Sequence, residues 1–249
     1  VPATPRPDTI LARRASRGHP AGMAEHHLTG GSGSAPLLDA ATVVLLRDGD
    51  AGVECLMVRK TSGQEFGGLW VFPGGRVEEA DGAGFEGARQ GAVREAAEET
   101  GLVLRAGDLV PIAHWTPPVT APRRYATWFF VGTLGDVVAD VTVDGGEIGD
   151  HVWTRPDDAI ARHAAGEIEI IPPTWVTLEG LVGFVDAAAM VAATREAEPR
   201  EFMSRSLASR KALLWEGDAA YETALDESPL PDEESTDRHR LDMSGLPWV

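Results

Sequence analysis

Short runs of β-branched and aliphatic residues recur along the chain and are separated by polar or glycine-rich stretches. Two such runs, 41–47 and 53–60, flank Asp48-Gly49-Asp50, whose composition is typical of a hairpin turn, so they predict two antiparallel strands. A third run ends at Phe72. Further strands are expected over 109–114, 125–134 and 167–171, and at the end of 145–153.

Three stretches have the apolar spacing or the terminal residues that are typical of helices. Residues 85–100 are predicted to be helical and to end at Gly101, because glycine readily adopts the left-handed conformation of a helix C-terminus. A second helix over 156–166 begins with proline and two aspartates, which suit its positive end. A third, over 174–190, has apolar positions that would cover one face of a sheet.

The stretch between the third strand and the first helix concentrates the residues that indicate chemistry. Pro73-Gly74-Gly75 forces a turn that a side chain would obstruct. On the following helix, Glu95, Glu98 and Glu99 share an arc of about 100°, so their carboxylates converge. Two carboxylates about 6 Å apart repel by ~3 kcal/mol at an effective dielectric constant near 20. A cation is therefore expected among them.

Hard oxygen ligands of this kind select Mg²⁺ or Mn²⁺, and Mg²⁺ commonly joins a few carboxylates to substrate phosphates. The alternative is a solvated acidic helix face without a ligand, which is the ordinary reason for an isolated Glu-x-x-Glu-Glu. The neighbouring glycine turn and Arg94 favour the metal site. The implied substrate therefore carries phosphates.

The same residues resemble the signature of the Nudix hydrolases, which is glycine, five residues, Glu, seven residues and Arg-Glu-aliphatic-x-Glu-Glu-x-Gly-aliphatic. Glu86, seven residues and the run from Arg94 to Leu102 fit it. Ten residues, instead of five, separate Gly75 from Glu86. Either Asp81 takes the early acidic place, or the turn carries an insertion and Glu86 keeps it. We favour Glu86, because its intact spacing to Arg94 predicts a contact between these two side chains.

The resemblance implies a fold and a set of residue roles. The fold is of the α/β (α+β) class, with a mixed β-sheet sandwiched between helices, and the reaction is metal-assisted attack of water on a diphosphate linkage. By residue-wise comparison, the metal ligands would be Glu95, Glu98, Glu99, Glu86 and the carbonyl group of Gly75. The catalytic residues would be Glu95, Glu98 and Arg94, with Arg94 orienting the carboxylates and one glutamate, left open, acting as the base. Glu147 matches a late-loop acid that meets the metal as ligand or base.

Residues outside the signature loosely resemble the peroxisomal coenzyme-A diphosphatases and their bacterial relatives. Trp115-Thr116-Pro117 and the run 123–130 carry this likeness, and Arg59 and Gly68 fit the coenzyme-A signature. Two positions depart from that signature, with Gln64 and Phe66 standing where Arg and His are expected. Coenzyme A or an acyl derivative, ADP-ribose, NADH, dinucleoside polyphosphates and oxidised nucleotides are therefore all candidate substrates. A catalytically silent Nudix domain that binds a nucleotide or a protein partner is the alternative.

The charge of the chain limits its partners. A formal net charge of −17 argues against adhesion to nucleic acid or to an anionic membrane, because both need a basic surface. A small anionic substrate needs a local cation, and Arg124 is the candidate for phosphate contact, with Arg59 as a second substrate-binding residue. The expected partner is a small nucleoside diphosphate derivative, and a homodimer is left open.

Cysteine content, apolar run length and segment composition predict the location and the domain organisation of the protein. Cys55 is the only cysteine, so no disulfide forms within the chain, and a reducing, cytoplasmic location is the simpler expectation. No uninterrupted apolar run reaches the roughly 20 residues of a membrane span. Residues 1–36 are predicted to be a disordered lead, and 37–249 a single domain whose C-terminal extension covers about 197–249.

Overall fold

The computed structural model describes residues 35–63, 65–134, 140–143, 145–207, 211–222 and 238–249. The predicted lead, apart from its last two residues, lies outside this part of the chain. The strands are β1 (Leu37–Gly49), β2 (Gly52–Lys60), β3 (Trp70–Val71), β4 (Gly74–Arg76), β5 (Val110–Thr116), β6 (Arg124–Thr133), β7 (Ile148–Thr154), β8 (Arg200–Met203), β9 (Arg205–Leu207), β10 (Ala212–Leu214) and β11 (Arg240–Asp242). The helices are α1 (Gly84–Thr100), α2 (Pro156–Ala164), α3 (Pro172–Leu181) and α4 (Ala187–Arg195), with short 3-10 turns η1 (Glu79–Asp81) and η2 (Ala106–Asp108).

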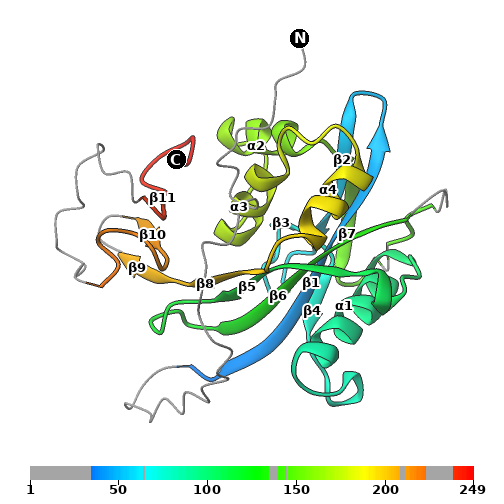
Figure 1. The fold of residues 1–249 in the computed structure, drawn as a ribbon, viewed down its shortest axis with the longest axis horizontal. Coiled ribbons are helices and arrows are strands. Elements are labelled where there is room, and N and C mark those ends of the chain that lie inside the picture. The colour runs from blue at the N-terminus through cyan, green and yellow to red at the C-terminus, as the bar shows by residue number, and fades with distance from the viewer. Residues whose placement is uncertain (1–34, 64, 135–139, 144, 208–210, 223–237) are drawn as a thin grey trace.

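Eight of the strands form one mixed sheet (Figure 1). Its order is β3-β2-β1-β6-β5-β8, with β4 also paired to β1 and β7 to β2. β1 runs parallel to β6, and β5 runs parallel to β8, while the other pairs are antiparallel. The predicted hairpin joins β1 and β2, and its last pair is Gly49 with Gly52, so the turn itself is Asp50-Ala51. The mixed sheet is confirmed.

Helices cover both faces of this sheet (Figure 1). On one face, Ala88, Ala92 and Ala96 of α1 are buried against β1 and β6, because small side chains let the helix approach the sheet closely. On the other face, α2, α3 and α4 bury a separate apolar cluster. The predicted arrangement of a sheet between helices is therefore confirmed, and α1 ends at the left-handed Gly101 as expected.

The glycine turn is fixed to the middle of the sheet. Gly74 pairs with Thr42 of β1, whose hydroxyl group donates to the carbonyl oxygen of Pro73 at 2.7 Å. A Cβ atom on Gly74 would lie 2.4 Å from the carbonyl oxygen of Ala41, so only glycine fits. The following residue, Gly75, is thereby held beside α1.

Two local predictions are wrong. Residues 167–171 do not form a strand: they make one backbone hydrogen bond to β3, from the amide of Trp70 to the carbonyl of Glu169 at 2.9 Å, although Ile168 and Ile170 are buried as expected. The helix predicted over 174–190 is two helices, because Asp186 accepts the amide of Ala189 and begins α4 anew. The first difference involves a contact with the distant strand β3, and the second a local cap at the start of α4.

The last part of the chain adds to the sheet and then forms a smaller one. β8 pairs with β5, whereas β9, β10 and β11 form a three-stranded antiparallel sheet. A buried ion pair, with Arg240 Nε 2.7 Å from Asp218 Oδ2, holds this second sheet, and Trp248 packs edge-on against His163 of α2. Within the described part of the chain, no helix combines the length and apolar character that crossing a membrane requires.

Candidate active site at the glycine turn and the acidic helix

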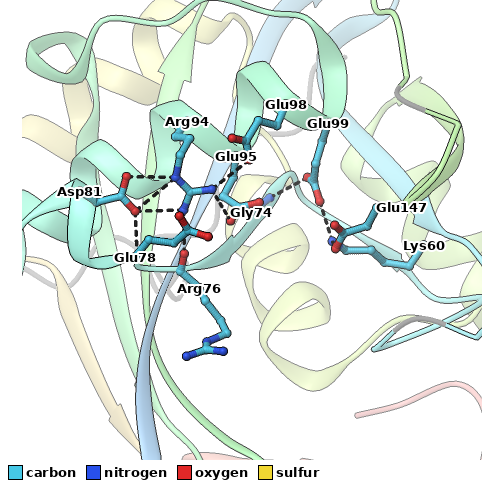
Figure 2. A network of polar contacts seen from close by, with 10 residues as sticks. All are labelled: Lys60, Gly74, Arg76, Glu78, Asp81, Arg94, Glu95, Glu98, Glu99 and Glu147. Atoms are coloured by element: carbon cyan, nitrogen blue, oxygen red, sulfur yellow. Dashed lines mark hydrogen bonds and ion pairs between the residues drawn. The ribbon is translucent and has the colours of Figure 1, made fainter.

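Arg94 of α1 gathers three carboxylates around one guanidinium group (Figure 2). Its Nη1 atom donates to Glu95 Oε1 and to Glu98 Oε2, each at 2.9 Å. Its Nε and Nη2 atoms donate to the two oxygens of Asp81, and Nη2 also donates to the carbonyl oxygen of Arg76 at 2.9 Å. The expected orienting role of Arg94 therefore has a structural basis, since this side chain ties the carboxylates to β4.

The expected contact between Glu86 and Arg94 is wrong, because Asp81 makes it instead. Glu86 pairs with Arg89 at 3.1 Å and its side chain is 69% exposed, while that of Asp81 is 6% exposed. A separation of eight residues along a helix spans about 12 Å, which keeps Glu86 two turns away from Arg94. Asp81, and not Glu86, thus makes the contact with Arg94 that we predicted for the early acidic residue.

The extra residues between Gly75 and α1 form a compact turn that brings Asp81 into position. Asp81 accepts the backbone amide of Glu78 at 2.8 Å and closes the 3-10 turn. A Cβ atom on Gly87 would lie 2.4 Å from the carbonyl oxygen of Gly82, so this turn folds directly onto α1. The hydrogen bond from Arg94 is the main reason that the pKa of Asp81 is lowered, and this bond also raises the pKa of Arg94.

Glu95 lies directly against the backbone of the glycine turn. A Cβ atom on Gly75 would be 2.5 Å from Glu95 Oε1, so the turn leaves a space that the carboxylate fills. Burial raises the pKa of Glu95, and the hydrogen bond and charge of Arg94 oppose that shift. Glu98 is the most accessible of the three helix glutamates, with a side chain 59% exposed.

A second group of charges surrounds the ammonium group of Lys60 (Figure 2). Its Nζ atom lies 2.5 Å from Glu99 Oε1 and 2.6 Å from Glu147 Oε1. The other oxygen of Glu99 accepts the backbone amide of Gly74 at 2.9 Å. Glu147 directly precedes β7, so the late-loop acid does reach the helix glutamates.

Burial and charge shift the pKa values of Glu99 and Lys60. Desolvation raises the pKa of Glu99 to about 7, and the attraction of Lys60 only partly offsets it. Desolvation alone would lower the pKa of Lys60. The charges and hydrogen bonds of Glu99 and Glu147 have a larger, opposite effect, so the pKa of Lys60 is raised. Sequence reasoning missed Lys60. The available signal was a charged residue at the end of the buried run Leu56 to Val58.

The two predicted substrate-binding arginines lie in different settings. Arg59 is half-exposed, stacks over Trp70 with its guanidinium carbon 5.9 Å from the ring centre, and stands 3.9 Å from Asp150. With Lys60, it lines a pocket of about 230 Å³ next to the charged cluster; the other lining residues are Thr61, Ser62, Gly68 and Gly149. Arg124 begins β6 opposite Leu37, and its Nε atom is enclosed without a hydrogen bond from the described residues. The structure thus brings Arg59 to the cluster, while no contact joins Arg124 to the glutamates.

The carboxylates around Arg94 and Lys60 fit a hard divalent cation in their chemistry. Five of them contact these two cations, so within the described contacts the carboxylates outnumber the cations by three; they are Asp81, Glu95, Glu98, Glu99 and Glu147. Carboxylate and carbonyl oxygens are the ligands that Mg²⁺ and Mn²⁺ prefer. Among the described residues, however, no three acidic, histidine or cysteine side chains already converge in a metal-holding arrangement. Binding an ion therefore requires some of these side chains to turn toward a common point.

Fold and site together define a hydrolase of phosphate anhydrides, and comparison with known proteins gives its family. A model of the NUDIX domain matches residues 36–174, more than half of the chain. The chain therefore belongs to the Nudix family, and it is a Nudix hydrolase that acts on a diphosphate linkage. None of the curated proteins that were compared matches it.

One solved structure gives the same result for the fold, and two others are less similar. A Nudix hydrolase from Alicyclobacillus acidocaldarius is 25% identical, with a TM-score of 0.57, over 63% of this chain and 96% of that one. A Caenorhabditis elegans Ap4A hydrolase is 20% identical with a TM-score of 0.45, over 62% and 98%. The Nudix domain of NrtR from Shewanella oneidensis, solved with ADP-ribose, is 18% identical with a TM-score of 0.44, over 65% and 88%. No comparison supports the coenzyme-A diphosphatase subgroup.

Proposed function

We propose that the protein hydrolyses a nucleoside diphosphate derivative by attack of water on one phosphorus, with Mg²⁺ or Mn²⁺ as the cofactor. A bound divalent ion would supply positive charge to the phosphoryl oxygens and lower the pKa of the attacking water. The observation that carries the proposal is the gathering of Glu95, Glu98, Glu99 and Glu147 at one glycine turn, with more negative charge than Arg94 and Lys60 balance.

Different residues of the site would hold the cofactor, orient the carboxylates and accept the proton. The cofactor would be held by Glu95, Glu98 and Glu99, with the carbonyl group of Gly75. Glu86 has no support for such a role, because it pairs with Arg89 away from Arg94. Arg94 would keep the carboxylates oriented through its contacts to Glu95 and Glu98. One glutamate would take the proton of the attacking water, and Glu147 is a candidate because its side chain is half-exposed.

Substrate phosphates need cations that the glutamates have not neutralised. Arg59 supports this role because it borders the pocket beside Lys60 and its ion pair with Asp150 is long, at 3.9 Å. For Arg124, the support for phosphate binding comes only from the chemistry of its side chain, since a charged guanidinium group offers paired donors to phosphate oxygens. Arg59 also lies over the Trp70 ring, with its guanidinium carbon 5.9 Å from the ring centre.

A silent domain that binds a nucleotide without cleaving it is the second candidate. The favouring observation is that Glu95 and Glu98 are already paired with Arg94, and Glu99 with Lys60. Against it stands the excess of carboxylates over these cations, which a purely structural ion-pair network would not need.

The two candidates differ in products, so the test is direct. The protein is incubated in ¹⁸O-labelled water with ADP-ribose, NADH, a dinucleoside polyphosphate, an oxidised nucleotide and coenzyme A, with Mg²⁺ or with Mn²⁺, and products are identified by mass. The expected result is cleavage of at least one compound into two phosphate-terminated products, one carrying a single labelled oxygen, and complete loss of turnover with a chelator. Tight binding without any cleavage would establish the silent domain instead.

A further inference from the structure

Lys60 occupies an unusual place for a lysine. Its side chain is only 6% exposed, and its Nζ atom contacts one oxygen of Glu99 and one of Glu147 within 2.6 Å. It is the last residue of β2, whose preceding residues Met57 and Val58 are fully buried. A buried ammonium group is stable only when anions surround it closely, and here two carboxylates do so.

We propose that the ammonium group of Lys60 is a built-in cation that takes the position of one divalent ion between Glu99 and Glu147, and so lowers the number of divalent ions that the site binds. The inference rests on the proposed metal-dependent function. It concerns the metal requirement of this chain, which the proposed function leaves open.

The carboxylate of Glu99 and the backbone of Glu147 are held in place by contacts other than Lys60. The amide of Gly74 donates to the second oxygen of Glu99, which fixes that carboxylate to the glycine turn. The loop of Glu147 is joined to the residue after Lys60, because the amide of Thr61 donates to the carbonyl of Glu147 at 2.8 Å and its hydroxyl donates to the carbonyl of Gly146 at 2.8 Å. The backbone therefore holds Glu99 and the loop of Glu147 near each other, and the ammonium group of Lys60 contacts both carboxylates.

A divalent ion cannot share the position between Glu99 and Glu147 with Lys60. Its ligand oxygens would be Oε1 of Glu99 and Oε1 of Glu147, which the ammonium group already contacts. Magnesium ligands lie at about 2.0–2.1 Å, so the ion would stand at contact distance from a positive charge. Glu95 and Glu98, which share Arg94, remain for the divalent ion together with the second oxygen of Glu99, and Glu98 is open to solvent.

Counting bound Mn²⁺ tests this inference without reference to activity. Free Mn²⁺ is measured by electron paramagnetic resonance during titration of the full chain, its Lys60→Gln and Lys60→Arg variants, and Arg89→Gln. Arg89 pairs with Glu86 on α1. Its variant therefore changes the net charge by as much as Lys60→Gln does, without altering the contacts between Lys60, Glu99 and Glu147. Lys60→Gln should bind one more Mn²⁺ per chain than the parent, while Lys60→Arg and Arg89→Gln should match the parent.

Equal numbers and affinities of Mn²⁺ in the parent and Lys60→Gln would overturn the inference, and a parent that binds Mn²⁺ and cleaves a diphosphate would leave the proposed function intact. If neither protein binds Mn²⁺, both proposals fall. Should Lys60→Gln be poorly folded, its melting temperature is followed during the Mn²⁺ titration. The rise should exceed that of the parent, because metal replaces the missing cation, and equal rises would contradict the inference.

Discussion

The carboxylate of Asp81 and the guanidinium group of Arg94 meet side by side, with Nε 3.0 Å from one carboxylate oxygen and Nη2 2.9 Å from the other. The two residues come from different elements, the 3-10 turn and the middle of α1. This pair fixes the turn onto the helix and leaves Nη1 of Arg94 for Glu95 and Glu98. The positions of Glu95 and Glu98 thus depend on a residue outside the acidic helix.

Replacing Asp81 should therefore destabilise the protein, while replacing Glu86 should not. Asp81→Asn removes a charged partner from a buried contact with Arg94, and the free energy of unfolding should fall by about 2–4 kcal/mol. Glu86→Gln loses only a surface ion pair, with an expected change within about 0.5 kcal/mol. Denaturant unfolding measures both values. Losses of similar size in the two variants would contradict the assignment of Asp81.

Gly75→Ala should impair catalysis through Glu95. The new methyl group would lie 2.5 Å from Glu95 Oε1, so the carboxylate must move. A displacement of about 1 Å at a catalytic group can lower turnover about 100-fold, and a loss of that order is expected in diphosphate hydrolysis. Gly107→Ala is the matched control, because no atom lies within 4 Å of its added Cβ atom. Full activity in Gly75→Ala would show that Glu95 need not rest against the turn.

The pKa of Glu99 predicts how stability changes with pH. Because its pKa is raised by burial from 4.5 to about 7, the folded protein binds the proton more tightly than the unfolded chain. The resulting stabilisation is fully present below pH 4.5 and is lost as pH rises through about 7. Its size is at most about 3 kcal/mol. Glu99→Gln removes this term, so the difference in free energy of unfolding, variant minus parent, should increase between pH 5 and pH 8 in metal-free buffer. Parallel pH profiles would contradict the raised pKa.

Arg124→Ala should weaken substrate binding more than metal binding. Loss of a charge-assisted hydrogen bond to phosphate corresponds to about 1.5–3 kcal/mol, or a rise in KM of roughly 10- to 100-fold, with Mn²⁺ affinity unchanged. Arg105→Ala is a suitable control, since Arg105 pairs with Asp108 at an exposed position. An unchanged KM for the hydrolysed compound would assign Arg124 to the protein surface.

The sequence was sufficient for the parts of the fold that local signals determine. The helix ending at Gly101, the hairpin at Asp50 and the central strands all follow from glycine conformation and apolar pattern. Helix geometry predicted that Glu95, Glu98 and Glu99 converge. Arg94 holds Glu95 and Glu98, whereas Glu99 turns to Lys60. Local signals determine these features because the participating residues lie within one element or in two strands joined by a short turn.

The rest depends on contacts between distant segments. Spacing along the helix favoured Glu86, but the inserted turn folds onto Gly87 and presents Asp81, which no periodic pattern encodes. Lys60 meets Glu99 and Glu147 only because β2 and β7 pair beside α1, bringing together residues 39 and 87 positions apart. Such long-range pairings are set by packing, and a single sequence does not display them.

Replacement of Glu98 by glutamine tests the central claim most directly. The carboxylate is exposed, so Glu98→Gln should unfold at the same denaturant concentration as the parent. If the acidic helix holds a divalent ion for diphosphate cleavage, Mg²⁺-dependent turnover of the best compound in the panel should fall by about 100-fold or more. Turnover equal to that of the parent, under the same metal and substrate concentrations, would contradict the account.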